Sequence, residues 1–111
     1  MSTAESPAPD TAASDLDSID IVPVLQSLSD PVRLEILRQV AGAGETELSC
    51  GQLDLPVGKS TCSYHLKMLS VAGVIAEREE GTRKFLSLRR TELDERFPGL
   101  LDSVLRGAGV G

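Results

Sequence analysis

Residues 58–75, GKSTCSYHLKMLSVAGVI, carry the clearest structural signal in this sequence. Cys62, Leu66 and Leu69 recur at helical spacing and form one apolar stripe. Gly73 follows as a typical helix stop, so the sequence predicts an amphipathic helix over 59–72. The face opposite the stripe combines hydrogen-bonding side chains with positive charge, and it consists of Ser60, Ser63, Tyr64 and Lys67.

The residues before this helix predict a helix-turn-helix. Asp30 and Pro31 are typical of the cap and the first position of a helix, and Gly42 is typical of its end. The pattern over 47–54 predicts a second, shorter helix with two leucines facing inward, and Pro56 prevents its continuation. A short turn then leads into the 59–72 helix, which completes the helix-turn-helix arrangement.

A β-hairpin is predicted directly after the helix-turn-helix. β-Branched and aromatic residues over 74–79 and 83–88 flank a turn that contains glycine. Arg78, Arg83 and Lys84 cluster at its tip, where a wing lies against a neighbouring groove or the phosphate backbone. The predicted fold is therefore α+β and mostly α, a winged helix-turn-helix with a two-stranded β-wing.

Helices are also predicted at both ends of the domain. Apolar residues recur at helical spacing over 18–28. Near the other end, Thr91 and Asp94 resemble a capping box that opens a short helix, and Pro98 starts a final helix that Gly107 ends. Because these helices extend a complete winged helix, their apolar side chains predict a homodimer interface, made of Val22, Leu25, Leu100, Leu101, Val104 and Leu105. For the four residues of the last helix, the alternative is that they only cap the core of the monomer.

Charge is distributed unevenly along the 111 residues, whose net charge is −6. Residues 1–20 carry five acidic residues and no basic ones, whereas residues 58–90 carry seven basic and three acidic residues. The overall acidity lowers non-specific affinity for DNA. The basic block nevertheless provides a local face that can bind phosphates.

The length fits one domain, which is predicted over 16–106. A disordered acidic tail is expected at 1–15 and a flexible C-terminus at 107–111. No apolar run is long enough to cross a membrane, and no secretory signal begins the chain, so no membrane partner is expected. With only two cysteines, the chain fits a cytoplasmic protein without a disulfide framework.

Several blocks of this sequence resemble the arsenic-repressor-type (ArsR/SmtB) winged-helix regulators. They are LSDPVRLEIL at 28–37, KSTCSYHLKML at 59–69 and AGVI at 72–75, and the wing REEGTRK at 78–84 also matches. The likeness extends from about Leu25 to Leu88, more than half of the chain. The resemblance implies a homodimer whose first and last helices form the interface, and a repressor that an inducer releases from its operator.

The metal sites of that family are not expected here. Metal-sensing relatives place two cysteines in the helix before the turn, at positions that Ser49 and Gly51 occupy in this chain, with Cys50 between them. The other common site uses Asp and His pairs on the last helix, where this chain has no histidine. Because a soft divalent metal needs several thiolate or imidazole ligands, neither a metal nor another cofactor is predicted.

Cys50 and Cys62 allow two interpretations. In one, oxidation of the thiols moves the reading helix away from DNA, which makes the protein a redox-responsive repressor. In the other, both side chains pack as small hydrophobic groups; this interpretation is favoured because free cysteine is among the most buried residue types. His65, on the flank of the same helix, is expected to pack at its edge or to contact a phosphate.

We therefore expect a sequence-specific, DNA-binding transcriptional regulator, a homodimeric repressor of an inverted-repeat operator in duplex DNA. The 58–72 helix and the 76–88 wing are expected to bind that DNA. Ser60, Ser63 and Tyr64 are expected to face base edges or nearby phosphates, and the basic side chains to hold phosphates. The complete predicted DNA-binding set is Lys59, Ser60, Thr61, Ser63, Tyr64, His65, Lys67, Arg78, Arg83 and Lys84.

Three questions stay open at this point. An unidentified small-molecule inducer is a further partner that the sequence allows. A winged helix that contacts only other proteins is an alternative function, and it predicts no salt-sensitive DNA binding. An enzyme is poorly supported, because the sequence contains one histidine and no visible nucleophile–base pair, phosphate loop or metal cluster.

Overall fold

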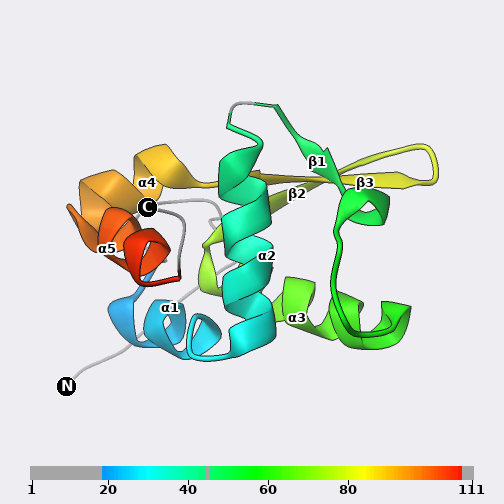
Figure 1. The fold of residues 1–111 in the computed structure, drawn as a ribbon. Helices are drawn as coiled ribbons and strands as arrows, with labels where there is room; N and C mark the ends of the chain where they lie inside the picture. Colours follow the sequence, from blue (N-terminus) through cyan, green and yellow to red (C-terminus); the bar gives the residue numbers. More distant parts are fainter. Residues whose placement is uncertain (1–18, 45, 109–111) are drawn as a thin grey trace, which may run out of the picture.

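The computed structural model describes residues 19–44 and 46–108 (Figure 1). Within these residues the chain forms five α-helices, one short 3-10 helix and a three-stranded antiparallel sheet, so the mostly helical α+β winged-helix fold is confirmed. The predicted acidic tail at 1–15 and residues 109–111 lie outside the described residues. The elements are α1 (Ile21–Ser27), α2 (Pro31–Gly42), β1 (Leu48–Ser49), η3 (Cys50–Gln52), α3 (Lys59–Ala72), β2 (Ile75–Glu80), β3 (Arg83–Leu88), α4 (Arg90–Arg96) and α5 (Leu100–Gly107).

Two local signals set the ends of the central helices, as predicted. Asp30 caps α2: its Oδ1 accepts hydrogen bonds from the backbone N–H groups of Val32, at 2.8 Å, and Arg33, at 3.2 Å. Gly73 ends α3 in the left-handed conformation, with φ of 89°. A Cβ atom at Gly73 would also lie 2.9 Å from Cγ1 of Ile19, so both backbone conformation and packing require glycine there.

The prediction of a helix over 47–54 is wrong. Leu48 and Ser49 form the short strand β1, which pairs with β3 so that Leu48 faces Leu86 and Ser49 faces Phe85. Only the 3-10 turn η3 follows, and the N–H of Ser49 donates to Oε1 of Gln52 at 2.9 Å at its start. The sheet order is therefore β1-β3-β2, and the predicted two-stranded wing is extended by a third strand at its base.

The C-terminal helices begin at different residues from those predicted. α4 starts at Arg90 after Arg89, whose side chain makes no cap, so Thr91 and Asp94 do not form the predicted capping box. Asp94 instead pairs with Arg90 at 3.4 Å. α5 starts at Leu100, two residues after the predicted Pro98, because Gly99 turns the chain with φ of 83°.

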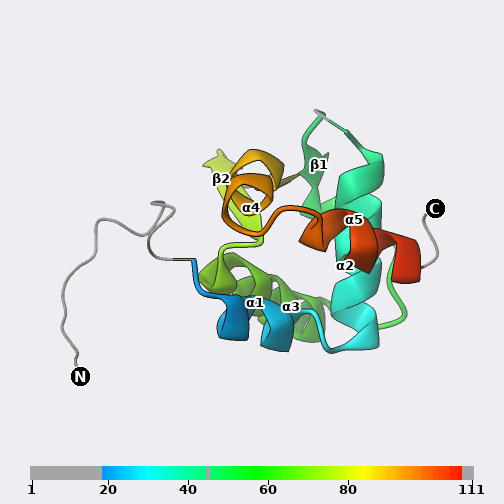
Figure 2. The same cartoon turned by 90° about the vertical axis from the view of Figure 1, so that its left-hand side faces the viewer.

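The core is built from aliphatic side chains of every helix and of the sheet. α1 and α2 both pack on α3, and α2 also packs on β3, so the reading helix is held between the N-terminal helices and the sheet. α4 and α5 pack on each other beside α1 (Figure 2). No helix among the described residues is long and apolar enough to cross a membrane.

Two of the six residues predicted for a dimer interface belong instead to the core of the single chain. Leu101 is only 1% exposed and Leu105 only 6%, because the helical spacing of α5 turns both toward the interior. Leu100 and Val104 are partly buried against the same core. The two predicted interface residues on α1 are exposed instead: Val22 is 57% exposed and Leu25 is 47% exposed. Only the α1 pair is thus freely available to a partner.

Candidate nucleic-acid interface

The first turns of α3 present a polar face to solvent. Leu66 and Leu69 are buried and Cys62 is half-buried, so the predicted inward stripe faces the core. Tyr64 is 58% exposed. The other exposed members of the predicted DNA-binding set on this helix are Lys59, Ser60, Thr61, Ser63 and Lys67. The division of α3 into a buried and an exposed face is therefore as predicted.

The N-terminus of α3 adds to the polarity of this face. Its N-cap is Gly58, which makes no side-chain cap for the first N–H groups of the helix. These groups and the helix dipole favour a negative charge at that end. Figure 1 places the first turn of α3 and the tip of the β2–β3 hairpin on one side of the molecule, and α1, α4 and α5 on the other.

His65 is not part of the exposed face: of the two roles expected for it, the structure agrees with packing at the helix edge and disfavours the phosphate contact that placed it in the DNA-binding set. It is only 8% exposed, and its Nδ1 lies 3.1 Å from Nη1 of Arg33. A guanidinium can only donate, so Nδ1 is the acceptor in this contact. Arg33 also donates through Nε to the carbonyl oxygen of Ser27, at 2.6 Å. His65 thus links α3 to the turn between α1 and α2.

A second link fixes the segment that leads into α3. The side chain of Gln39 on α2 donates to the carbonyl oxygen of Asp54 at 2.8 Å and accepts from the N–H of Asp54 at 2.9 Å. Its Nε2 also donates to Glu35, at 2.7 Å. These contacts hold the connector against α2, and so they position the first turn of α3. Sequence reasoning missed both Gln39 and Arg33, because their partners lie far away in the sequence.

Arg78 on the wing is already held by two carboxylates. Its guanidinium pairs with Glu47 at 2.6 Å and with Glu80 at 3.1 Å, and it lies over the ring of Phe85 at 4.8 Å. The hydrogen bonds that Arg78 donates to Glu47 and Glu80 raise the pKa of Arg78, and those to Glu47 lower the pKa of that carboxyl group. Arg78 therefore braces the wing against the segment before β1, a role that its position in the sequence did not indicate.

Arg83 and Lys84 are the other two wing cations. Arg83 is exposed, and its guanidinium lies 5.4 Å from the centre of the Phe85 ring. Within the described part of the chain, no carboxylate pairs with Arg83, Lys59 or Lys67. Lys84 pairs with Glu77 across the hairpin at 3.4 Å. Of the wing residues, Arg83 is thus the one that can reach a phosphate without first losing an ion pair.

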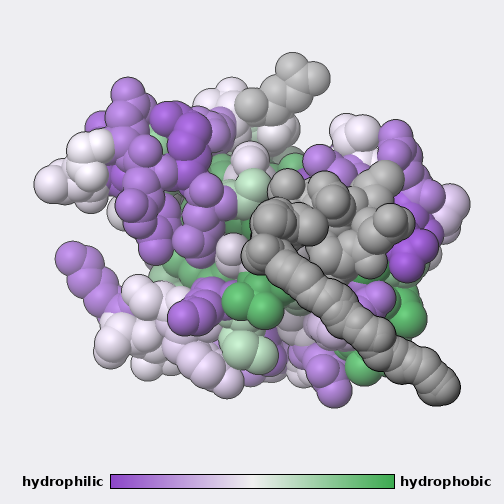
Figure 3. Space-filling view, turned by 180° about the vertical axis from the view of Figure 1, so that it is seen from behind, coloured by the Kyte–Doolittle hydropathy of each residue, from purple (hydrophilic) through white to green (hydrophobic). Residues whose placement is uncertain are grey.

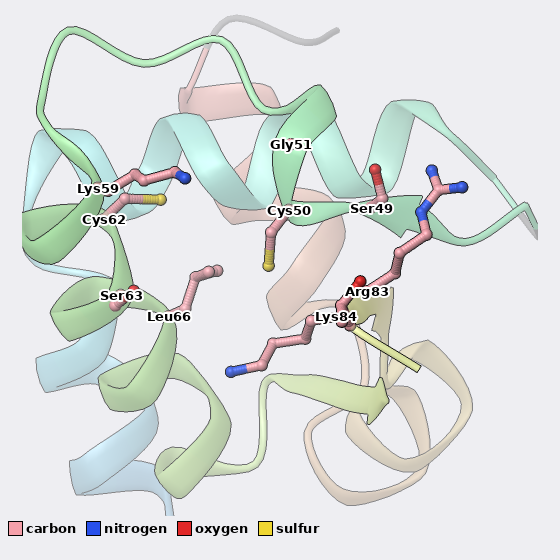
Figure 4. Close-up of a pocket in the computed structure, with 10 residues that line it drawn as sticks. Ser49, Cys50, Gly51, Lys59, Cys62, Ser63, Leu66, Arg83 and Lys84 are labelled. Atoms are coloured by element: carbon pink, nitrogen blue, oxygen red, sulfur yellow. The ribbon is translucent and has the colours of Figure 1, made fainter. Parts of the chain in front are cut away.

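Both cysteines line one cavity between α3 and the wing (Figure 4). They are free and half-buried, and burial raises the pKa of each thiol. At Cys50 the positive charge of Lys84 acts in the opposite direction, but burial has the larger effect. Among the residues that the structure describes, no group of three or more His, Cys, Asp or Glu side chains could hold a metal ion.

Comparisons with known proteins agree with this geometry. Residues 28–78 match a helix-turn-helix domain family. YceK of Bacillus subtilis, an uncharacterized HTH-type transcriptional regulator, is 37% identical over 83 residues, which are 73% of this chain and 82% of the relative. The arsenical resistance operon repressor of the same organism is 31% identical over 87 residues, which are 78% and 82% of the two chains. Rv2034 of Mycobacterium tuberculosis, an HTH-type transcriptional regulator, is 37% identical over 70 residues, which are 61% of this chain and 63% of the relative.

The matched region covers the features described above. It contains the capped start of α2, the whole of α3 and the first four residues of β2. A polar helix face and a wing cation without an ion pair among the described residues, Arg83, suit a DNA-binding regulator. The chain therefore belongs to the arsenic-repressor-type (ArsR/SmtB) winged helix-turn-helix proteins, which are DNA-binding transcriptional regulators.

Proposed function

We propose that the protein is a homodimeric repressor that binds an inverted-repeat operator with α3 in the major groove and the wing on the adjacent backbone. The observation that carries this proposal is the common placement of two elements. The first turn of α3, which carries exposed polar residues, and the tip of the β2–β3 hairpin, where β3 begins at the exposed Arg83, lie on the same side of the molecule (Figure 1). Such a helix and wing can contact one segment of duplex DNA together.

The exposed residues of α3 divide into two chemical groups. Ser60, Ser63 and Tyr64 carry hydroxyl groups that donate and accept, as base edges in the major groove require. Lys59 and Lys67 carry only positive charge and suit phosphates. We assign sequence preference to the first group and general affinity to the second, together with Arg83.

The homodimer is proposed to form on the side opposite the wing. Ile21, Val22 and Leu25 leave an exposed apolar face on α1, and hydrophobic atoms are visible on that side when the molecule is seen from behind (Figure 3). A second copy that covers this face would place two α3 helices on one face of the duplex, about one helical turn apart. Leu100 and Val104, which are partly buried, can contribute the rim of that interface.

We further propose that the regulator acts without the metal-ligand sets of its family. Ser49 and Gly51 stand where metal-sensing relatives carry cysteine, and burial raises the pKa of Cys50 and Cys62. Since the thiolate is the reactive form, this shift also disfavours a peroxide-sensing role for the two cysteines. Their half-burial in one cavity supports a packing role instead.

Two measurements on the full chain test the proposal. Light scattering after size-exclusion chromatography should give the mass of a dimer, and Val22→Glu with Leu25→Glu should give a monomer because a charge then enters the apolar face. Ala76→Glu, which adds a charge on the exposed surface of β2, is the matched control and should stay dimeric.

A hydroxyl-radical footprint on the DNA upstream of the gene then tests the operator. The proposal expects two protected segments related by two-fold symmetry, with centres about one turn of DNA apart. A monomeric wild type, or a single asymmetric footprint, would contradict the homodimer on an inverted repeat.

A further inference from the structure

A cavity of about 440 Å³ separates the first turns of α3 from the tip of the wing. Its walls come from three parts of the chain that are distant in sequence: β1 with η3, α3, and the tip of the β2–β3 hairpin. This volume falls in the range of small-molecule sites, about 300–1,000 Å³. None of the DNA contacts proposed above requires such a hollow.

The walls of the cavity combine positive charge with an apolar floor. Lys59, Arg83 and Lys84 line it, whereas no carboxylate does so among the described lining residues. Figure 4 shows the Lys84 side chain directed into the space toward Leu66. The uncapped N-terminus of α3 lies at the same side, since Lys59 is the first residue of that helix. An anion entering the cavity would meet cations from two walls, and it would compete with Glu77 for Lys84, because Nζ of Lys84 lies 3.4 Å from Oε1 of Glu77.

The rest of the lining is suited to an uncharged body. Leu66 is buried at the floor, and the sulfur atoms of Cys50 and Cys62 face the space from two sides (Figure 4). Because burial raises the pKa of both thiols, they are uncharged at neutral pH and present a soft, weakly polar surface. Ser49 and Ser63 add hydroxyl groups at the margin.

We propose that this cavity binds a small organic anion, with its acidic group on Lys84, Lys59 and Arg83 and its apolar body on Leu66 and the two cysteines. This inference rests on the proposed function, because Lys59 and Arg83 are also assigned to DNA phosphates. A bound anion occupies these cations and lies between the reading helix and the wing. Anion binding and DNA binding therefore oppose each other, and each weakens the other by the same factor.

The first experiment follows anion binding without DNA, by titrating the ¹⁵N-labelled full chain and recording ¹H–¹⁵N correlation spectra. The probes are benzoate and hexanoate. Two compounds serve as controls: benzyl alcohol, which lacks the charge, and acetate, which lacks the apolar body. We expect saturable shifts of the amides of residues 49–51, 62–66 and 82–84 with benzoate or hexanoate, and much weaker binding of the two control compounds. Failure of both probes to saturate, or shifts confined to α1, would overturn the anion site.

Variants locate the site and separate it from the DNA contacts. Lys84→Gln should weaken the binding of benzoate or hexanoate about two- to fivefold, the effect of one exposed charge pair. Cys50→Met should fill the cavity and lower the affinity for the same probe, while the affinity for DNA is retained. Lys67→Gln removes a cation of α3 outside the cavity and should leave the probe unaffected. Equal loss with Lys67→Gln and Lys84→Gln would show general charge attraction and contradict a built site.

The second experiment measures competition with DNA by fluorescence anisotropy. At an anion concentration of about nine times its own Kd, the apparent Kd for DNA should rise about tenfold per protomer. If the spectra show the anion in the cavity but DNA affinity is unchanged, the proposed competition between anion and DNA is wrong, while the proposed anion site is supported. If the chain does not bind DNA at all, the proposed function fails, and the spectra still decide whether the cavity takes an anion.

Discussion

Arg83 and Arg78 provide a matched pair of substitutions on one hairpin. Arg83→Gln and Arg78→Gln change the net charge by the same amount and remove the same side chain. Arg83 is without an ion pair in the described part of the chain, whereas Arg78 pairs with Glu47 and Glu80. We therefore expect Arg83 to contact a phosphate and Arg78 to brace the wing, so the two variants should differ in the salt dependence of DNA binding.

The size of the difference follows from counterion release. Each phosphate contact contributes about 0.9 to the slope of log affinity against log salt concentration. A dimer of Arg83→Gln loses two such contacts, so its slope should fall by about 1.8. Between about 50 and 200 mM salt, its affinity should therefore change about twelvefold less than that of the wild type. Arg78→Gln should change the slope by less than half as much.

Fluorescence anisotropy with a labelled duplex from the upstream region, titrated at several potassium chloride concentrations, measures these slopes. A duplex of scrambled sequence should give the same change in slope for Arg83→Gln, because a phosphate contact carries no sequence information. Equal slopes for Arg78→Gln and Arg83→Gln, or an unchanged slope for Arg83→Gln, would refute the assignment of the two wing arginines.

Three further predictions concern stability. Gly73→Ala should destabilise the fold by about 1–3 kcal/mol in urea unfolding, because of its positive φ and the Ile19 contact, whereas Gly42→Ala, with open space around it, should have little effect. Leu101→Ala should cost about 2–5 kcal/mol as a core truncation, and Leu25→Ala, tested as a monomer at high dilution, much less. Hydrogen bonds from Arg38 and Gln39 hold the pKa of Glu35 at about 2, below its usual 4.5. The contribution of Glu35 to stability is therefore present above about pH 4.5 and is lost as the pH falls toward 2. In acid unfolding followed by circular dichroism, Glu35→Gln should lose less stability over that range than the wild type.

The parts of the fold that the sequence predicted well are those with local causes. The cap at Asp30 and the stop at Gly73 each depend on groups within a few residues, and both are present in the structure. The two faces of α3 follow from helical spacing alone, and the hairpin follows from β-branched residues around a glycine turn. Local chemistry was thus sufficient for the reading helix and the wing.

The errors arose where distant residues decide the outcome. Leu48 suits a helix or a strand, and its pairing with Leu86, 38 residues later, selects the strand. Leu101 has the apolar character of an interface residue, but the rest of the chain covers it. His65 lies on the flank of α3 in any helical projection, and only the contact with Arg33 shows that it faces inward. No periodicity in the sequence reports these contacts.

The exposed polar face of α3 is proposed to give the protein its sequence preference, and one anisotropy experiment measures that preference. The wild type and Ser63→Ala are titrated with the upstream duplex and with a scrambled duplex at one salt concentration. We expect the wild type to prefer the upstream duplex, and Ser63→Ala to reduce this preference while its affinity for the scrambled duplex stays the same. Equal weakening on both duplexes, or no salt-sensitive binding of the wild type to either, would contradict sequence reading by α3.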